Sequence, residues 1–442
     1  MSTTAASPSS RGNGCSPWIR SAPYDLAFFV GTPLLCLAVF LPIAARVPSL
    51  SIYLAVMAFS SFGHHLPGFL RAYGDGEVFR RFKARLLLAP PLVFAAFWFF
   101  TSRELVGARF FLMAWSVWHV SMQHFGFLRI YDAKVGQTSK RVALLDRALA
   151  LSWFASIVLW SPQYSHDFLG NLVDVGAPLP AAGALLALRT TVFALTGLIT
   201  AAWIGVAVLE TRAGRPVSAV KITLHVVTIT FLAIVWVGLG DLLLGLAIWE
   251  VFHDVQYFAI TWVHGQRLVA KGLGDTRFMR FLFRGRAPLV LLYVAAIAGY
   301  GAIDWAIVSS PSSSARLQAL LIAFVFTSTA LHYYYDSFLW KVRSPRTREG
   351  LGLDGASRAD RVLSPSLRSG ALQVALFAVP LGALAAMELT RDDDPARQVA
   401  LRETIRAVAP RAGAAHRNLA VAYDRTGRLD EARAEFQAAL RL

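Results

Sequence analysis

Long apolar runs recur along most of this chain, from about residue 25 to about residue 390. The apolar core of a bilayer is about 30 Å thick, and a helix that rises about 1.5 Å per residue needs about 20 apolar residues to cross it. Eleven runs have this length, and they span residues 25–45, 51–70, 86–102, 110–128, 143–160, 190–209, 218–237, 241–264, 287–308, 317–340 and 369–388. The pattern therefore predicts an all-α fold, a polytopic bundle of about eleven transmembrane helices.

The same pattern divides the chain into three parts. Residues 1–22 form a polar tail, residues 23–390 the transmembrane domain, and residues 391–442 a more polar helical domain. The first apolar run is too long for the apolar region of a cleavable signal peptide, so we expect it to remain as an anchor. The stretch 162–188 is less apolar, and the sequence leaves open whether it is an external loop or contains a re-entrant segment.

The C-terminal domain carries the pattern of a helical repeat. The stretch Ala414–Leu442 reads AAHRNLAVAYDRTGRLDEARAEFQAALRL, and it resembles a tetratricopeptide repeat. The residues that match the spacing of that family are Leu419, Ala420, Tyr423, Gly427, Ala432, Phe436 and Ala439. The resemblance implies a surface that binds a protein partner. The alternative is a helical hairpin that only completes the fold.

The composition agrees with a membrane protein. Of the 442 residues, 56% are hydrophobic and only 16% are charged, and the mean hydropathy is +0.51. A soluble globular protein carries about 25% charged residues. This balance excludes a disordered chain, a collagen-like chain and a small disulfide-stapled domain. Because Cys15 and Cys36 form no CxxC pair, the sequence also contains no thiolate metal set.

The positions of the basic residues explain the net charge of +16. The loops after the even-numbered runs, taken with the first turn of the next run, hold 26 Lys and Arg residues, and the loops after the odd-numbered runs hold five. Basic loops stay on the cytoplasmic side. We therefore predict a protein of the inner or plasma membrane, with a cytoplasmic N-terminus and an external C-terminus. Because the charge serves topology, we expect no nucleic-acid partner.

Histidine placement is the most informative chemical signal. Seven of the ten histidines lie in even-numbered runs, and they are His64, His65, His119, His124, His253, His264 and His332. All of these runs end at the predicted cytoplasmic face. Polar side chains in membrane helices face the bundle interior, because exposing an ionisable group to lipid costs several kcal/mol. We expect these imidazoles to meet in one polar cavity. The remaining three, which we interpret as structural, are His166, His225 and His416.

Two regularities concern the helices that carry these histidines. At about 100° per residue, His124 is turned by about 140° from His119 on the same helix. The motif GFLRAY at Gly68–Tyr73 recurs as GFLRIY at Gly126–Tyr131, each time shortly after a histidine. The repeated position at a predicted cytoplasmic helix end favours a duplicated two-helix unit.

Imidazole is the commonest protein metal ligand and suits Fe, Zn and Cu. The metal ligands that we predict are His65, His119, His124, His253 and His332, with His64, His264 and Asp254 as further candidates. Glu250 and Asp336 are the candidate catalytic groups. Glu250 is a candidate proton carrier, and Asp336 would bind the metal or orient an imidazole. A nitrogen-rich set with some oxygen and no thiolate favours non-haem iron, as one ion or as a di-iron pair.

In gathering several histidines from different membrane helices, this set of candidate ligands is similar to the histidine-box membrane di-iron hydroxylases and desaturases, and to the carotenoid-cleaving membrane oxygenases. The sequence contains neither an HxxxH nor an HxxHH box, so we carry over no residue assignment from these families. The resemblance implies O2-dependent oxidation of a lipid or other apolar substrate that enters from the bilayer. We therefore favour a metal-dependent membrane oxidoreductase.

Three alternatives remain open from the sequence. Histidines at similar depth, such as His119 and His332, would suit a bis-histidine haem protein that transfers electrons. Buried histidines would also suit a transporter of protons or metal ions, whose helices are often broken near the middle of the membrane. A membrane scaffold that presents the C-terminal domain to a protein partner would need no chemistry.

Overall fold

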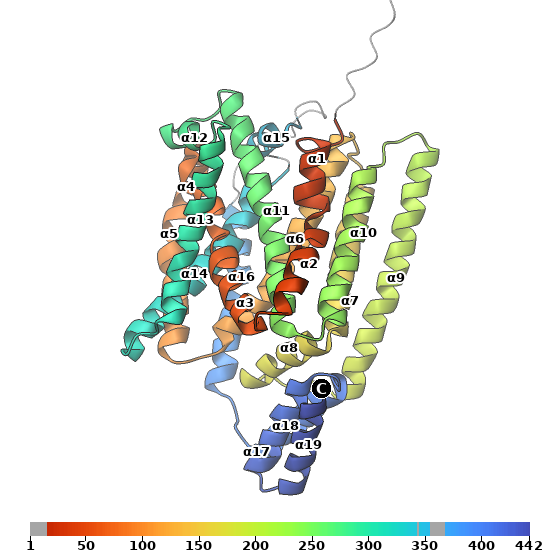
Figure 1. The fold of residues 1–442 in the computed structure, drawn as a ribbon, viewed down its shortest axis with the longest axis vertical. Helices are drawn as coiled ribbons and strands as arrows, with labels where there is room; N and C mark the ends of the chain where they lie inside the picture. Colours follow the sequence, from red (N-terminus) through yellow and green to blue (C-terminus); the bar gives the residue numbers. More distant parts are fainter. Residues whose placement is uncertain (1–15, 343, 354–366) are drawn as a thin grey trace, which may run out of the picture.

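The structure is a computed structural model that describes residues 16–342, 344–353 and 367–442. Every regular element in these residues is helical, which confirms the predicted all-α class for the described part of the chain. The long helices lie side by side in one bundle (Figure 1). Cys15 lies outside the described residues, as do residues 343 and 354–366 of the loop between the tenth and eleventh predicted runs.

Eight helices are long and apolar enough to cross a membrane. They are α5 (Gly76–Ser102), α7 (Lys140–Trp160), α9 (Ala182–Arg212), α10 (Ala219–Ala233) with the π-helical turn that extends it to Gly238, α11 (Leu242–Ala270), α13 (Ala287–Ser309), α14 (Ala315–Leu339) and the part Ala371–Leu389 of α16 (Leu367–Leu389). A bent helix pair near the N-terminus is a ninth candidate. The described residues therefore support eight or nine spans, and the predicted number of eleven is not confirmed.

The bent pair corresponds to the first predicted run. Its parts are α1 (Ala22–Asp25), a π-helical turn that ends at Val30, and α2 (Thr32–Ala44). The two halves meet at an angle of 54°. Gly31 lies at the bend, and Pro33 follows in the first turn of α2, where its missing backbone N–H leaves no helical hydrogen bond unmade. The bend therefore has a local cause in the sequence.

Two predicted runs, 51–70 and 110–128, are not among the eight helices. The first is broken into α3 (Ser49–Val56), the π-helical turn η2 (Met57–Phe62) and α4 (His65–Gly74). The second lies in α6 (Gly107–Lys134), which is long enough to span a membrane but not apolar enough. Both segments carry candidate metal ligands. The polar side chains that would build a site therefore also weaken the apolar signal of these two segments.

The two ends of the bundle carry different short elements (Figure 1). At one end lie α12 (Arg277–Leu282) and α15 (Pro345–Leu351). At the opposite end lie α8 (Pro162–Asp174) and the C-terminal helices α17 (Pro395–Val408), α18 (Gly413–Arg425) and α19 (Leu429–Arg441). The stretch 162–188 thus contributes a short helix at the end of the bundle, beside the C-terminal domain.

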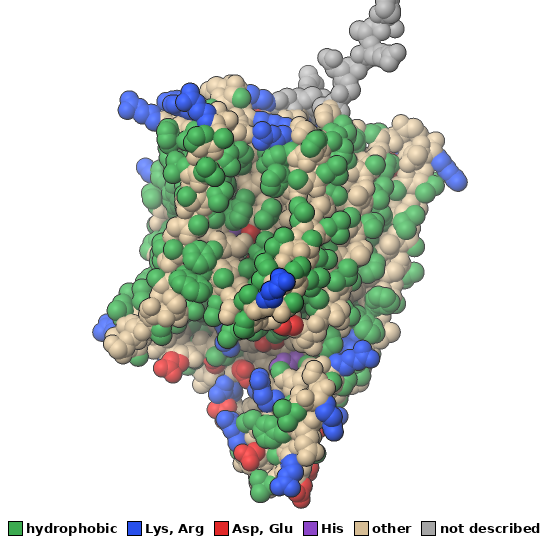
Figure 2. Space-filling model, in the orientation of Figure 1, with side chains coloured by type: hydrophobic (Ala, Val, Ile, Leu, Met, Phe, Trp, Pro, Cys, Tyr) green, Lys and Arg blue, Asp and Glu red, His purple; other side chains and the backbone are tan. Residues whose placement is uncertain are grey.

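Apolar side chains cover the sides of the bundle (Figure 2). Leu92 in α5 and Leu198 in α9 are both 68% exposed, and Leu291 in α13 is 72% exposed. Charged side chains gather toward the two ends in the same view. Apolar surface of this extent is unusual for a soluble monomer. It is compatible with an integral membrane protein.

The C-terminal helices pack against α8. The Arg402 guanidinium of α17 donates to the Asp174 carboxylate at 2.6 Å, and the Asn418 amide of α18 lies 3.1 Å from His166 Nε2. α18 and α19 form a hairpin whose turn contains Gly427 at φ +75°, a conformation that favours glycine. The predicted helical domain therefore docks on the bundle, and its relation to tetratricopeptide repeats stays a prediction.

Candidate metal centre

Four buried histidines from four parts of the chain meet inside the bundle. They are His64 at the start of α4, His119 in α6, His253 in α11 and His332 in α14. One ring nitrogen from each lies within 4.8 Å of those of the others, and none of the four residues is more than 8% exposed. We call these residues the four-histidine cluster. Part of the predicted convergence of imidazoles is therefore present in the structure.

His64 reaches the cluster because the chain is broken just before it. The turn η2 ends at Phe62, and α4 begins only at His65. Gly63 lies in this break, where a Cβ atom would be only 2.9 Å from the Ile297 carbonyl oxygen of α13. π-helical turns inserted into helices recur at functional sites. The break frees the His64 side chain from the regular register of α4.

One hydrogen bond cannot account for both close contacts of His332 Nε2 in the cluster. His332 Nε2 lies 3.0 Å from His64 Nε2 and 3.1 Å from His119 Nε2. A ring nitrogen carries either one hydrogen or one lone pair, so His332 Nε2 cannot donate to one neighbour and accept from the other. A cation between these nitrogens would accept the lone pairs of all three. The geometry therefore suits a metal ion.

The other nitrogen of His64 has the surroundings expected for a metal ligand. His64 Nδ1 lies 3.0 Å from Asp254 Oδ1 and also contacts the Ser61 carbonyl oxygen. Asp254 Oδ2 in turn accepts a hydrogen bond from the Ser60 hydroxyl at 2.6 Å. Histidines that bind metals usually donate their second N–H to a carboxylate or a carbonyl. The Ser61 carbonyl thus accepts the Nδ1 hydrogen, with the Asp254 carboxylate beside it, and the Nε2 lone pair faces the cluster.

Asp336 lies beside the same nitrogens. Its Oδ2 is 3.7 Å from His332 Nε2 and 4.0 Å from His119 Nε2, while its Oδ1 accepts a hydrogen bond from the Tyr257 hydroxyl at 2.8 Å. Asp336 therefore offers an oxygen at the edge of the cluster. Glu250 lies on α11, three residues before His253. Its carboxylate accepts a hydrogen bond from the Ser61 hydroxyl at 3.1 Å.

His253 closes the cluster on the side of α11. Its ring centroid lies 5.1 Å from that of His64 and 5.0 Å from that of His119. Neither of its ring nitrogens has a hydrogen-bond partner among the described residues, although the side chain is 1% exposed. Buried polar groups without a partner are rare in folded proteins. A bound metal ion would give one of these nitrogens its partner.

Three predicted histidine ligands lie outside the four-histidine cluster, as does Asp254, which contacts His64. His65 borders it, because its ring lies 5.0 Å from that of His332, but its Nδ1 lies 3.0 Å from the Ser328 hydroxyl. His124 and His264 lie elsewhere in the bundle. The physical reason is helix geometry: His124 is turned away from His119, and eleven residues of α11 separate His264 from His253, which corresponds to about 16 Å.

His124 forms a separate pair with a residue that we interpreted as structural. His124 Nε2 lies 3.0 Å from His225 Nδ1 of α10. Among the described residues, His124 Nδ1 and His225 Nε2 have no hydrogen-bond partner. This pair brings no third histidine, cysteine or carboxylate to the same point in the described residues. It therefore lacks the ligand set of the four-histidine cluster.

Gly68 is a site residue that the sequence indicated only through the GFLRAY repeat. A Cβ atom at Gly68 would lie 2.8 Å from the Tyr257 hydroxyl and 3.5 Å from His332 Nδ1. Glycine at this position lets Tyr257 reach Asp336. Gly126, its counterpart in the repeat, has open space at the same point. The two motif copies therefore have different surroundings.

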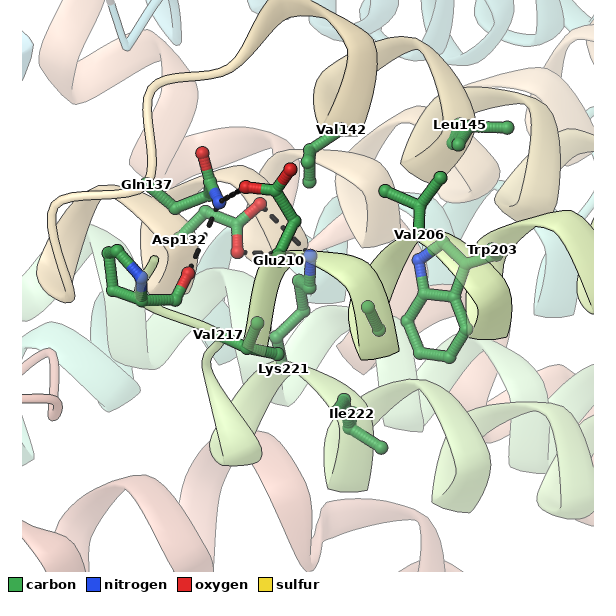
Figure 3. Close-up of a pocket in the computed structure, with 12 residues that line it drawn as sticks. Asp132, Gln137, Val142, Leu145, Trp203, Val206, Glu210, Val217, Lys221 and Ile222 are labelled. Atoms are coloured by element: carbon green, nitrogen blue, oxygen red, sulfur yellow. Dashed lines mark hydrogen bonds and ion pairs between the residues drawn. The ribbon is translucent and has the colours of Figure 1, made fainter. Parts of the chain in front are cut away.

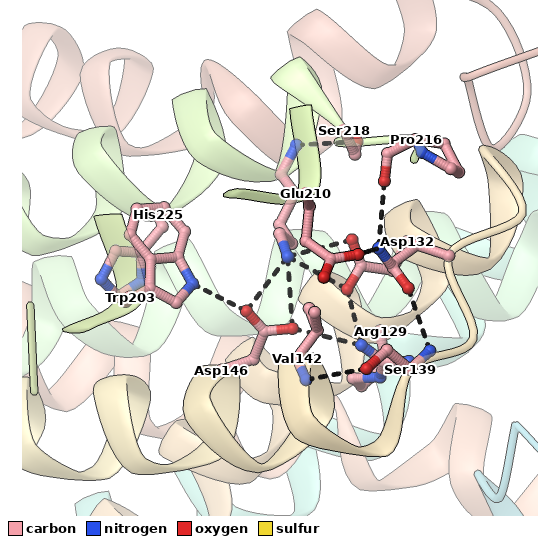
Figure 4. A network of polar contacts seen from close by, with 12 residues as sticks. Arg129, Asp132, Ser139, Val142, Asp146, Trp203, Glu210, Pro216, Ser218 and His225 are labelled. Atoms are coloured by element: carbon pink, nitrogen blue, oxygen red, sulfur yellow. Dashed lines mark hydrogen bonds and ion pairs between the residues drawn. The ribbon is translucent and has the colours of Figure 1, made fainter. Parts of the chain in front are cut away.

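A second polar network lies between α6, α7, α9 and α10 (Figure 4). Lys221 Nζ lies 3.0 Å from the Asp132 carboxylate and 3.1 Å from Asp146 Oδ1. Arg129 Nη1 lies 2.6 Å from Asp132 and 3.2 Å from Asp146, and Trp203 Nε1 donates to Asp146 at 2.8 Å. Two carboxylates and two cations balance one another here. The network therefore has the features of a structural link between these helices.

A small hollow adjoins this network (Figure 3). Asp132, Trp203 and Lys221 line it together with Gln137 and Glu210. The Gln137 amide donates to Glu210 at 3.1 Å and to a backbone carbonyl at 3.2 Å. These contacts occupy the polar groups that border the hollow. We therefore place the candidate functional site at the four-histidine cluster.

No protein-family model, no curated protein and no solved structure matches this chain. The four-histidine cluster is therefore judged by its own geometry.

Proposed function

We propose that this protein is a membrane metalloenzyme in which the four-histidine cluster binds a transition metal ion. The observation that carries the proposal is the position of His332 Nε2, close to both His64 Nε2 and His119 Nε2 inside a buried site. Imidazole nitrogens with a neighbouring carboxylate suit iron, and among the described residues the cluster includes no cysteine that would favour a zinc site of the structural type. Our proposed cofactor is non-haem iron.

The number of donor atoms at the cluster suits one ion. Four imidazole nitrogens lie within 4.8 Å of one another, and Asp336 adds an oxygen at the edge. A di-iron pair would need further ligands from His65 or Glu250, whose recorded contacts are with Ser328 and Ser61. The 3.1 Å separation of His119 Nε2 and His332 Nε2 also leaves no room for a porphyrin between these rings.

Iron in such a site supplies the activation of O2, and we propose oxidation of a lipid or other apolar substrate. The protein contributes the surroundings. The Ser61 carbonyl, with Asp254 beside it, favours the hydrogen on His64 Nδ1, Asp336 holds an acceptor oxygen beside the ligand nitrogens, and the bundle excludes water from the site. An apolar substrate would enter from the bilayer. The distribution of basic residues supports a cytoplasmic N-terminus and an external C-terminal domain, which we propose as the surface for a protein partner.

Metal analysis of the purified full-length protein tests the proposal. We expect the wild-type protein to contain iron, or to take up Fe(II) on reconstitution. The variants that should lose most of the metal, because each lacks one ligand, are His64→Ala, His119→Ala, His253→Ala and His332→Ala. If the wild-type protein holds only traces of any transition metal after reconstitution, the proposal is wrong.

Two matched controls make this test specific. His65→Ala removes the residue next to His64 in the sequence, and we expect it to retain the metal because His65 lies outside the cluster. His124→Ala removes an equally buried imidazole that pairs with His225, and it should also retain the metal. Loss of metal from both controls, in variants that still express and fold, would contradict the assignment of the ligands.

A further inference from the structure

A buried cation lies between the four-histidine cluster and the end of the bundle that carries α15. Arg71 of α4 is only 5% exposed. Its Nη2 donates to the Leu339 carbonyl at 2.8 Å and to the Thr347 hydroxyl at 2.9 Å. Its Nε and Nη1 are buried and have no hydrogen-bond partner among the described residues. Three of the five N–H donors of this guanidinium are therefore unused.

A second unused nitrogen lies near Arg71. The guanidinium carbon of Arg71 stacks 3.8 Å from the centroid of the Trp340 ring, and the ring of His264 lies 5.4 Å from that of Trp340. His264 is 2% exposed, and its Nε2 has no hydrogen-bond partner in the described part of the chain. Arg71 and His264 thus border the same indole, and each has at least one ring or guanidinium nitrogen without a hydrogen-bond partner among the described residues.

The nearby carboxylates are already engaged. Asp75 receives two hydrogen bonds from the Arg346 guanidinium, at 3.0 and 3.1 Å. Asp336 accepts from Tyr257 and faces the histidines. A buried charge that lacks a partner is costly, so buried cations are usually paired or hold a ligand. Arg71 therefore has the features of an anion-binding residue.

Arg71 is also connected to the four-histidine cluster. Trp340 Nε1 lies 3.3 Å from the Tyr257 hydroxyl, and that hydroxyl donates to Asp336 at 2.8 Å. One indole and one phenol thus separate the guanidinium from the carboxylate beside the cluster. Along α4, Arg71 follows His64 by seven residues, which corresponds to about 10 Å. A single amphiphile could therefore reach both sites.

We propose that Arg71 and His264 bind the anionic group, a carboxylate or a phosphate, of an amphiphilic substrate whose apolar chain points to the four-histidine cluster. This inference rests on the proposed function and specifies its substrate class. A guanidinium offers such oxygens charge-assisted N–H donors, and Nε and Nη1 of Arg71 each have N–H groups free to donate to one. A hydrogen on His264 Nε2 in addition to the one on Nδ1 would give the anion a further donor.

The test is equilibrium binding of radiolabelled dodecanoate and dodecan-1-ol to the full-length protein in neutral detergent. We expect the wild-type protein to bind dodecanoate at least tenfold more tightly than dodecan-1-ol. Arg71→Met should remove this preference and leave the affinity for dodecan-1-ol unchanged. Arg71→Lys, which keeps the charge but not the guanidinium donors, should keep part of the preference. His264→Gln keeps a neutral donor and should weaken dodecanoate binding less than Arg71→Met.

A matched control and a competition complete the experiment. Arg80→Met removes an exposed Arg that follows α4 in the chain, and it should leave the preference unchanged. Excess acetate should not displace dodecanoate. Displacement would show a site for small free anions and would contradict the proposal that the ligand is an amphiphile. Equal binding of the two probes by the wild-type protein would overturn the anion site without relying on any variant.

Metal analysis of the same preparations separates this inference from the proposed function. Arg71→Met should contain as much metal as the wild-type protein, because Arg71 does not reach the cluster. A wild-type protein that holds metal but does not prefer dodecanoate contradicts the anion site only. A wild-type protein without metal contradicts the proposed function, whatever it binds.

Discussion

The imidazole of His64 has two nitrogens in different surroundings, and this difference explains its place in the cluster. Nε2 faces His332, whereas Nδ1 faces Asp254 at 3.0 Å. A carboxylate in that position fixes the tautomer and makes the opposite nitrogen a better ligand. Asp254 is one residue after His253, so α11 supplies both a ring of the cluster and the group that orients another ring.

We expect Asp254→Asn to lower the metal affinity by about 10- to 100-fold, because the neutral amide holds His64 less firmly. Competition with a chelator of known affinity measures the effect. Glu250→Gln is the matched control: it changes a carboxylate one turn away that contacts Ser61, and it should leave the affinity unchanged. An equal loss in both variants would show that Asp254 has no specific role.

Lys221 is a buried cation of the second polar network. It is 4% exposed and lies between Asp132 and Asp146. Lys221→Met leaves both carboxylates with less compensation in the bundle, and removing one partner of a buried ion pair typically costs about 3–5 kcal/mol. We expect a clear fall in the thermal stability of the detergent-solubilised protein. Arg215→Met removes an exposed ion-pair partner of Glu210 and should change the thermal stability little.

Among the elements, the broken segment and the polar helix α6 supply two of the four cluster histidines, and the apolar helices α11 and α14 supply the other two. α3, η2 and α4 share one predicted span, and their break places His64. α6 is unbroken, but its histidines and other polar residues make it less apolar than the eight membrane-length helices. The break in one segment and the polar residues of the other explain why these two segments are not among the eight membrane-length helices.

The contact between α8 and α18 places a titratable group outside the membrane-spanning segments. His166 lies 3.1 Å from the Asn418 amide, and burial lowers the pKa of His166 to about 4, with Arg402 and Arg417 acting in the same direction and Asp174 opposing them. In the undocked state the pKa returns to its ordinary value near 6.5. Protonation therefore favours release of the C-terminal helices.

The sign of the pH dependence follows from this difference. Above pH about 6.5 His166 is neutral in both states, and docking keeps its full strength. As the pH falls from about 6.5 to about 4, docking should weaken by at most about 3 kcal/mol. Hydrogen exchange of α18 in the full-length protein measures this change. His166→Asn should flatten the pH profile of hydrogen exchange over that range. An unchanged profile would show that other groups cause the pH dependence.

The bundle has two distinct ends, and this arrangement yields a topology test. α12 lies at one end and the C-terminal helices lie at the other (Figure 1). Reporters that work only outside the cytoplasm should therefore give opposite results in the loop 270–285 and after residue 442. The distribution of basic residues predicts activity after residue 442 and none in the loop. The same result at both positions would contradict the arrangement of the bundle.

The helical class, the apolar runs and the concentration of histidines in a few helices follow from the order of residues along the chain. Each is a local property: an apolar run of sufficient length indicates a membrane helix, and its flanking charges indicate its direction. The sequence therefore predicts that imidazoles such as His119, His253 and His332 lie near one another. Helix periodicity also separates His124 from His119, although it does not supply its partner, His225.

The choice of the residues that meet depends on the packing of the helices. His64 rather than His65 joins the cluster, because a π-helical turn breaks the chain before it, and the apolar pattern carries no sign of that turn. The rotation and mutual distance of the helices place His225 beside His124. The same packing buries Arg71 against Trp340, where its charge alone indicated a residue at the membrane surface. These outcomes depend on contacts between distant segments, and such contacts exist only in the folded bundle.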